Sequence, residues 1–159
     1  MNICYLKFNE MTPTGQTEIA EAISTASKTQ EAQGHRIAGI SPEGVFSKHL
    51  GWLAMLDQTQ FGGYVGASQP IEHASKEYSQ VGTMLVSPGF IGQGIGFRLL
   101  HLLSNELAEA GRVPFAFCND ASLSIFKRVG YESAGAHEIP PSVQSKFDSP
   151  ALVLRQTVS

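Results

Sequence analysis

The stretch Val81–Phe97, VGTMLVSPGFIGQGIGF, decides the fold of this chain. An apolar run typical of a strand ends at Ser87-Pro88-Gly89, and three glycines, Gly92, Gly94 and Gly96, follow at the start of an amphipathic helix. Glycines let the backbone approach a ligand closely, and the N-terminal end of a helix carries about half a positive charge. The stretch therefore predicts a phosphate-binding loop, and a phosphorylated cofactor is the first hypothesis.

The composition is that of one globular domain. The 159 residues are 42% hydrophobic and 16% charged, with a net charge of −3 and no run of Lys or Arg, which argues against nucleic acid or an anionic membrane as a partner. The two cysteines, Cys4 and Cys118, match no metal spacing and no disulfide framework. We expect one cytoplasmic domain over residues 1–159 that binds no metal; a homodimer is left open.

Alternating patterns outside the opening stretch predict the rest of the fold. A strand over residues 2–8 precedes a helix over 17–30 and a short helix after Pro42; strands over 52–57, 62–67 and 78–86 follow, with a polar loop containing Glu72 and His73. A helix over 94–110 leads to a strand over 115–118, a helix through Val129, a strand from Tyr131 and a last strand over 151–155. The helical crossover makes strands 81–86 and 115–118 parallel neighbours.

Two familiar nucleotide-binding loops fit the glycines poorly. A loop of the ATPase kind needs Gly-Lys-Ser/Thr at the helix start, where this chain has Gly96-Phe97-Arg98. A dinucleotide fingerprint, G-x-G-x-x-G, would end at Phe97 counted from Gly92, or at Leu99 counted from Gly94. The first alternative is excluded and the second is weakened.

From Tyr78 to Gly135 the chain resembles the GNAT superfamily of N-acetyltransferases. The central motif of that family, (Gln/Arg)-x-x-Gly-x-(Gly/Ala) between a strand and a helix, corresponds here to Ile91–Gly96, IGQGIG. In the family the next strand ends in Asn, and the helix after it closes in Gly-Phe or Gly-Tyr; Asn119 and Gly130-Tyr131 match. Two motifs in the correct order and spacing are far more specific than glycines alone.

The resemblance implies a GNAT-like α/β fold. That fold is a mixed, largely antiparallel sheet of about six to seven strands, flanked by about three to four helices, in which a bulge splays the central parallel pair. The resemblance also implies acetyl transfer from acetyl-CoA to the primary amine of a small molecule or peptide, by direct attack in a ternary complex.

The resemblance further implies where the cofactor binds. Backbone N–H groups from Gly92 to Phe97 would hold the pyrophosphate, and the strand end at Met84–Val86 would hydrogen-bond the pantetheine arm. The N–H of Met84 would polarise the thioester carbonyl. The expected cofactor-binding residues are Met84, Leu85, Val86, Ile91, Gly92, Gln93, Gly94, Ile95, Gly96, Phe97, Asn119, Ser122 and Phe126.

Three positions depart from the family pattern. Ile91 stands where the family has Gln or Arg, so one side-chain contact to the phosphates is lost. Phe126 stands where the family often has a tyrosine that protonates the departing thiolate, and Ser122, one helical turn earlier, is the candidate replacement. Gln80 stands where some members have a glutamate base.

Other residues are candidates for the missing base. We expect Glu72 or His73 in this role, with Glu77 or a water chain as alternatives. Cys118 is expected to be a buried apolar side chain, because no base that would activate it is identifiable. Asn119 is as well suited to cap the following helix as to contact a cofactor.

The acceptor is expected between residues 30–50, the loop 68–77 and the segment 136–148, where the pattern is least regular. Acidic residues there would suit a cationic amine; they are Glu43, Glu72, Glu138 and Asp148. The alternative from another class is a non-catalytic GNAT-fold domain that binds acyl-CoA as a sensor or partner-binding module, and Gln80, Ile91 and Phe126 favour it.

Overall fold

The computed structural model describes residues 2–34, 39–118, 120–135, 137–143 and 150–155. The strands are β1 (Ile3–Lys7), β2 (Leu50–Leu56), β3 (Gln60–Ala67), β4 (Ile71–His73), β5 (Lys76–Val86), β6 (Arg112–Phe117), β7 (Tyr131–Ser133) and β8 (Ala151–Leu154). The helices are α1 (Pro13–Ala32), α2 (Pro42–Phe46), α3 (Ile95–Glu109) and α4 (Asp120–Val129), with 3₁₀ turns η1 (Phe8–Glu10) and η2 (Pro88–Phe90). Each predicted helix and strand is present, with its ends displaced by a few residues.

The strands form one mixed sheet. Its order is β1-β2-β3-β5-β6-β8-β7, and β4 adds to it by pairing with β5. In the described part of the chain, β5 and β6 are the parallel pair and the other neighbours are antiparallel. The predicted fold class is confirmed. The extra strand is β4, since the segment with Glu72 and His73, predicted as a polar loop, forms a hairpin with the start of β5.

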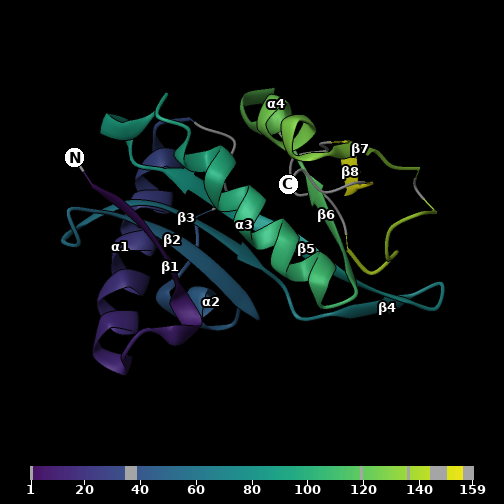
Figure 1. Ribbon diagram of the computed structural model, residues 1–159, viewed down its shortest axis with the longest axis horizontal. Helices are drawn as coiled ribbons and strands as arrows, with labels where there is room; N and C mark the ends of the chain where they lie inside the picture. The colour runs from purple at the N-terminus through teal and green to yellow at the C-terminus, as the bar shows by residue number, and fades with distance from the viewer. Residues whose placement is uncertain (1, 35–38, 119, 136, 144–149, 156–159) are drawn as a thin grey trace.

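Helices cover both faces of the sheet, and Figure 1 shows α3 lying along the face nearest the viewer. Alternation along the strands creates two cores: Leu53 and Tyr64 pack with α1 and α2, while the next residues, Ala54 and Val65, pack with α3 and α4. We call these the α1/α2 face and the α3/α4 face.

Local sequence explains where the two long helices begin. Thr12 caps α1 by accepting a hydrogen bond from the N–H of Gly15 at 3.1 Å, and Pro13 suits the first helical position. For this reason α1 begins a full turn before the predicted start at Thr17. The predicted apolar stripe of α3 is confirmed, because Leu99, Leu100, Leu103 and Leu107 are all 0% exposed.

A bulge in β5 opens the centre of the sheet. Tyr64 pairs with Leu85 but Gly66 pairs with Gly82, so β5 carries one extra residue at this point, and Thr83 there has a φ of +53°. The parallel ladder with β6 runs from Glu77↔Arg112 to Gln80↔Phe115, and no further pair follows in the described residues. The two strands are parallel neighbours, as predicted, but the residues that pair are 77–80 and 112–115, and the strands diverge over 81–86 and 116–118.

Candidate functional site

The glycine loop joins the end of β5 to the start of α3. Gly92 and Gly94 have φ values of +91° and +76°, a region that favours glycine, and a Cβ at either position would meet no atom within 4 Å. Gly96 differs, because its Cβ would lie 3.4 Å from Ile125 Cδ1 and 3.6 Å from Val86 Cγ2. Gly96 thus brings α3 close to α4 and β5, while the other two glycines keep the loop backbone open to a ligand.

The N-terminal end of α3 offers free hydrogen-bond donors. Gly94 is the N-cap residue and has no side chain with which to cap the helix. In the described part of the chain, no group accepts a hydrogen bond from the backbone N–H of Ile95, Gly96 or Phe97. Unpaired N–H groups and the positive end of the helix dipole make this position suitable for a phosphate.

These donors face a cleft of about 660 Å³, a volume in the usual range for ligand sites. The end of α1, the end of β5, the glycine loop, the start of α3 and one side of α4 enclose it. Its lining consists of Gln30, Gln33, Met84, Leu85, Val86, Pro88, Phe90, Ile91, Gly92, Gly94, Ile95, Gly96, Phe97, Ser122, Ile125 and Arg128.

Most of the predicted cofactor residues lie in this cleft. Those that line it are Met84, Leu85, Val86, Ile91, Gly92, Gly94, Ile95, Gly96, Phe97 and Ser122. Gln93 is exposed in the same loop but is not part of the lining, and Asn119 lies outside the described residues. Phe126 is a core residue, 4% exposed, with its ring edge-on to Tyr131 at 4.9 Å. The structure therefore places Phe126 behind the cleft, since its side of α4 faces the α3/α4 core.

Ser122 lies in the cleft and hydrogen-bonds the thiol of Cys118. Cys118 is 3% exposed, and burial raises the pKa of its thiol to about 12, although the bond to Ser122 acts in the opposite direction. The thiol stays protonated at neutral pH and is no nucleophile. Cys118 is thus a buried apolar side chain, as predicted, and Ser122 brings a hydroxyl to the cleft.

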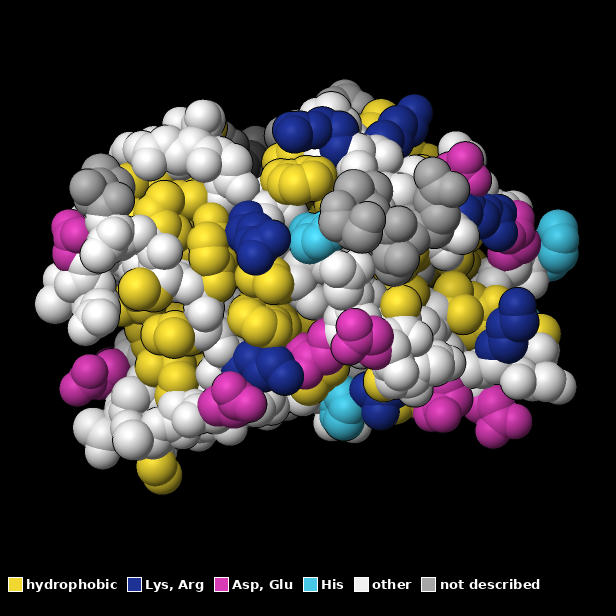
Figure 2. All heavy atoms as spheres, viewed as in Figure 1, with side chains coloured by type: hydrophobic (Ala, Val, Ile, Leu, Met, Phe, Trp, Pro, Cys, Tyr) yellow, Lys and Arg dark blue, Asp and Glu magenta, His cyan; other side chains and the backbone are white. Residues whose placement is uncertain are grey.

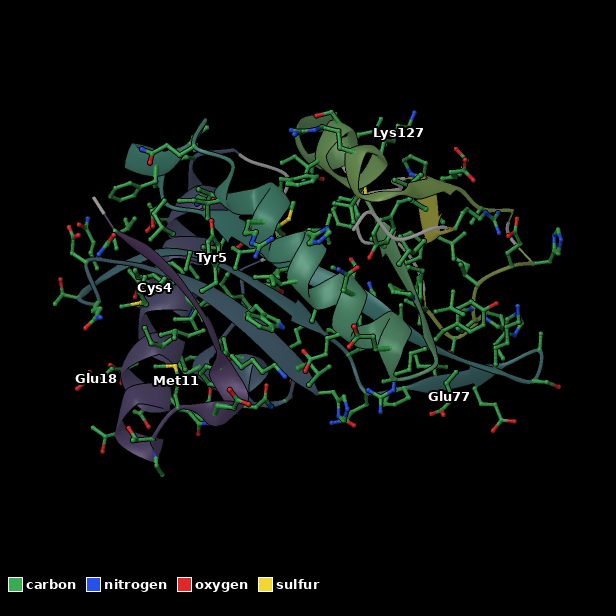
Figure 3. The ribbon with its side chains drawn as sticks, in the orientation of Figure 1. Cys4, Tyr5, Met11, Glu18, Glu77 and Lys127 are labelled. Atoms are coloured by element: carbon green, nitrogen blue, oxygen red, sulfur yellow. The ribbon has the colours of Figure 1, made fainter. Side chains whose placement is uncertain are left out.

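The predicted bases lie elsewhere. Glu72 pairs with Glu77 near the start of β5, whereas the cleft adjoins its end, and at ~3.3 Å per residue Met84 is roughly 20 Å from Glu77. Figure 3 shows Glu77 at the hairpin end, remote from Lys127 on α4. His73 donates from Nε2 to the carbonyl oxygen of His137 at 3.0 Å. The structure does not bring Glu72 or His73 to the cleft, because β4 pairs with the wrong end of β5 for that role.

The cleft also contains residues that the sequence did not single out. They are Gln30, Gln33, Pro88, Phe90, Ile125 and Arg128. Gln30 donates from Nε2 to the carbonyl oxygen of Val86 at 3.3 Å, and the Arg128 guanidinium lies 4.6 Å above the ring of Phe97. Figure 2 shows basic side chains over α4, at the top of the view. A basic residue in the last turn of α4 is a signal that could have suggested Arg128, whereas nothing local distinguishes Gln30.

The residues in the described ranges offer neither a metal-binding cluster nor a membrane-spanning helix. Those residues contain no cluster of three or more His, Cys, Asp or Glu side chains that could hold a metal ion. None of the helices in that part of the chain is long and apolar enough to cross a membrane. The features that do converge are an open glycine loop and the end of β5, whose edge toward β6 is unpaired in the described residues, and they suit a phosphorylated ligand with an amide-bearing arm.

A sheet with a splayed parallel pair, a glycine loop and an uncapped helix defines the class of fold, and comparison with known proteins identifies it. Residues 71–139 match the family described as FR47-like protein. No curated protein sequence matches the chain.

Three solved structures illustrate the likeness. An acetyltransferase of the GNAT family from Staphylococcus aureus Mu50 has a TM-score of 0.68 at 15% identity, covering 96% of this chain and 98% of that chain. The GNAT family N-acetyltransferase YhbS from Escherichia coli, in complex with CoA, has a TM-score of 0.64 at 18% identity, with 97% and 81% covered. N-acetylglutamate synthase from Neisseria gonorrhoeae, complexed with coenzyme A and N-acetyl-glutamate, has a TM-score of 0.72 at 17% identity, with 97% and 35% covered.

This chain therefore spans about a third of the synthase and nearly all of the Staphylococcus protein. The fold is that of the GNAT acetyltransferases, and the resemblance stated from the sequence is confirmed.

Proposed function

We propose that the chain is an acetyl-CoA-dependent N-acetyltransferase, organised as one domain over residues 1–159, that acetylates a primary amine by direct attack in a ternary complex. One observation carries the proposal: the free N–H donors of α3 and the end of β5 line the same cleft, and in the described residues the edge of β5 that faces β6 is unpaired there, while its other edge pairs with β3. The donors suit a diphosphate, and the strand end suits a chain of amides. Acetyl-CoA has both groups.

The phosphates of CoA would bind at the start of α3. The N–H groups of Ile95, Gly96 and Phe97 and the helix dipole supply the attraction, and the open space beside Gly92 and Gly94 admits the ligand. Arg128, at the edge of the cleft, adds a positive charge. Backbone N–H donors bind phosphate without needing a particular side chain. Ile91 in place of Gln or Arg therefore lowers the affinity for CoA without abolishing binding.

The pantetheine arm would lie along β5 where the strand leaves β6. Its amides would pair with backbone groups of Met84–Val86 in the manner of an added strand. Apolar side chains such as Phe90 and Ile125 would exclude water from the arm. The N–H of Met84 would then polarise the thioester carbonyl and stabilise the oxyanion.

The chemistry is a simple acyl transfer. The neutral amine attacks the thioester carbon, a C–N bond forms, the C–S bond breaks, and its electron pair leaves with the sulfur. The proton that the amine loses goes to the thiolate or to solvent. Ser122 is the candidate donor to the sulfur, and a well-placed acid or base typically contributes 10²–10⁴-fold. An enzyme with Gln80 and Phe126 at the usual acid and base positions would be slow and still active.

The rival function is a non-catalytic acyl-CoA-binding domain. The distance of Glu72 and His73 from the cleft, together with the burial of Phe126, favours it. Both functions require CoA to bind in the same cleft, so binding alone does not separate them.

One experiment separates them. Purified protein is incubated with acetyl-CoA and a panel of amines while free thiol is followed and products are weighed by mass spectrometry. Amine-dependent thiol release with an acetylated product supports the enzyme. If CoA raises the melting temperature but no acetylated product forms, the non-catalytic binding function is supported. If saturating CoA leaves the melting temperature unchanged, both functions are refuted.

A further inference from the structure

Three glycines lie side by side across the sheet. Gly51 of β2 pairs with Gly66 of β3, and Gly66 pairs with Gly82 of β5. We call these three residues the glycine row. A Cβ at Gly51 would touch Tyr64 and Phe8, which belong to the α1/α2 core, so the side of the glycine row that lacks side chains is on the α1/α2 face. The side chains of Tyr64 from β3 and of Lys48 reach over this strip, which ends beside the bulge at Thr83.

The hydroxyl of Tyr64 is directed over the glycine row. Its oxygen would lie 3.0 Å from a Cβ at Gly51 and 2.5 Å from one at Gly66, so Gly66 is needed to make room for it. Tyr64 is 0% exposed, yet its hydroxyl has no hydrogen-bond partner within the described ranges. A buried hydroxyl is ordinarily paired, so an unpaired one indicates a missing acceptor.

Lys48 extends along the same row. It follows α2, its backbone N–H donates to the carbonyl oxygen of Val45 at 3.2 Å, and its side chain passes over Gly66, with Cγ 3.2 Å from a Cβ placed there. The ammonium reaches the far end, 3.8 Å from a Cβ placed on Gly82. Lys48 makes no ion pair in the described part of the chain, and burial lowers the pKa of its ammonium. A partly desolvated ammonium has lost hydration that no ion pair replaces here, so an anion bound beside it would be stabilising.

The glycine row adjoins the expected position of the acetyl group. Gly82 precedes the bulge residue Thr83, and Met84, which lines the cleft, follows. Gly82 and Met84 are two residues apart across the bulge, so they lie within about 7 Å, the span that two residues reach at ~3.3 Å each when fully extended. A small acceptor could therefore contact Lys48 at one end and present its amine to the thioester at the other.

The acidic residues expected to bind a cationic acceptor do not compete with this arrangement. Glu138 already accepts from the Gly135 N–H at 2.9 Å and pairs with Arg155 at 2.6 Å, and these contacts hold its pKa below the usual value. Glu72 is at the remote hairpin, and Glu43 is exposed on α2. Asp148 lies outside the described residues.

We propose that the glycine row is the acceptor subsite and that Lys48, with the Tyr64 hydroxyl, binds a carboxylate of the acceptor, so that the substrate is an amine bearing a carboxylate, such as an amino acid. This proposal rests on the proposed function. The ammonium donates a charge-assisted hydrogen bond to the carboxylate and the phenol donates a second. The carboxylate supplies the acceptor that the buried phenol and the partly buried ammonium lack.

The test compares amino acids with their amides as acceptors, at α, β and γ spacings of amine and carboxylate. The amide keeps the amine and replaces the carboxylate by a neutral group, and a larger fraction of its amine is unprotonated at neutral pH because that amine is less basic. We expect wild-type protein to prefer the acid by kcat/KM at least tenfold, roughly the contribution of one charge-assisted bond. A preference for the amide, or for polyamines, would overturn the proposal and leave acetyl transfer intact.

Variants test which residues cause the preference for the amino acid over its amide. Lys48→Met is expected to raise KM for the acid at least tenfold and leave KM for the amide and the binding of CoA unchanged, whereas Lys48→Arg retains the preference in part. Tyr64→Phe is expected to raise KM for the acid a few-fold without lowering the melting temperature, because its hydroxyl has no partner to lose. Lys76→Met, at the exposed start of β5, is the control. A loss of kcat for acid and amide alike in Lys48→Met would make Lys48 a general base and refute the proposal.

A binding measurement settles the case in which no acceptor turns over. The NMR signal of the Lys48 side chain, assigned from its loss in Lys48→Arg, is followed during titration with a β-amino acid and with its amide. The proposal requires a shift with the acid that is absent with the amide. No shift with either would refute it, independently of whether the protein transfers acetyl groups.

Discussion

Replacing Gly94 by aspartate tests the phosphate site most directly. Gly94 is the N-cap of α3, is exposed, and has open space where a Cβ would stand, so an aspartate side chain would project into the region assigned to the pyrophosphate. Two unit charges 4 Å apart repel by about 4 kcal/mol at an effective dielectric constant of 20. Solvent reduces this to roughly 2 kcal/mol at an exposed position, which corresponds to about a 30-fold loss of CoA affinity.

The chain contains a matched control at the other end of the same helix. Gly111 has a φ of +79°, close to the +76° of Gly94, and a Cβ there also meets no atom within 4 Å. Aspartate at either position costs about 1 kcal/mol of backbone strain, or about 2–4 °C in melting temperature for a chain of this size. Gly94→Asp and Gly111→Asp should therefore carry similar backbone strain, Gly94→Asp should be the more stable because its charge lies at the positive end of the helix dipole, and Gly111→Asp should bind CoA like the wild type.

The assay is calorimetric titration of each variant with CoA, together with melting curves at zero and saturating CoA. Gly94→Asn, which adds similar bulk without charge, should lose less affinity than Gly94→Asp. Equal CoA affinity in Gly94→Asp and Gly111→Asp would refute the assignment of the loop. Equal losses in Gly94→Asn and Gly94→Asp would refute the electrostatic part of the reasoning alone.

Three further predictions concern α4 and the strand before it. Arg128→Met should weaken CoA binding about fivefold, the effect of one exposed charge, whereas Lys127→Met beside it should not, because Lys127 does not line the cleft; calorimetry distinguishes the two. Ser122→Ala should lower kcat about tenfold with CoA affinity unchanged, and an unchanged kcat would leave water or the thiolate itself to take the proton. Burial raises the pKa of Cys118 from 9.0 to about 12, so its contribution to the free energy of unfolding should be complete below pH 9 and be lost as the pH rises toward 12. Cys118→Ala should flatten that part of the stability profile, and iodoacetamide at neutral pH should alkylate the half-buried Cys4 while sparing Cys118, as mass spectrometry would show.

The order of elements and the cofactor end of the site could be predicted because their signals are local. The stripe of Leu99, Leu103 and Leu107 requires one buried helix face, and only glycine readily adopts the positive φ of Gly92 and Gly94. The crossover through α3 also makes β5 and β6 parallel without any knowledge of long-range contacts. Such features depend on residues that are close together in the sequence, so they can be predicted without knowledge of the tertiary structure.

The side chains around the chemistry could not be predicted in the same way. Glu72 and His73 are close to β5 in sequence, but hairpin pairing carries them to its far end, while Gln30, more than fifty residues from Val86, reaches its carbonyl oxygen. Arg128 lines the cleft and Phe126, two residues earlier, faces the core, because α4 packs by one side only.

Local residue types are enough to predict that a strand, a glycine loop and a helix make an anion site, since the backbone conformation and the helix dipole follow from them. The place where the sheet opens, and the residues beside that opening, depend instead on long-range packing. The bulge at Thr83 depends on the register of β3 against β5, and that register places Gly66 opposite Gly82 and brings Lys48 over both. Register is set by packing across the whole sheet, so no single segment of the sequence contains it.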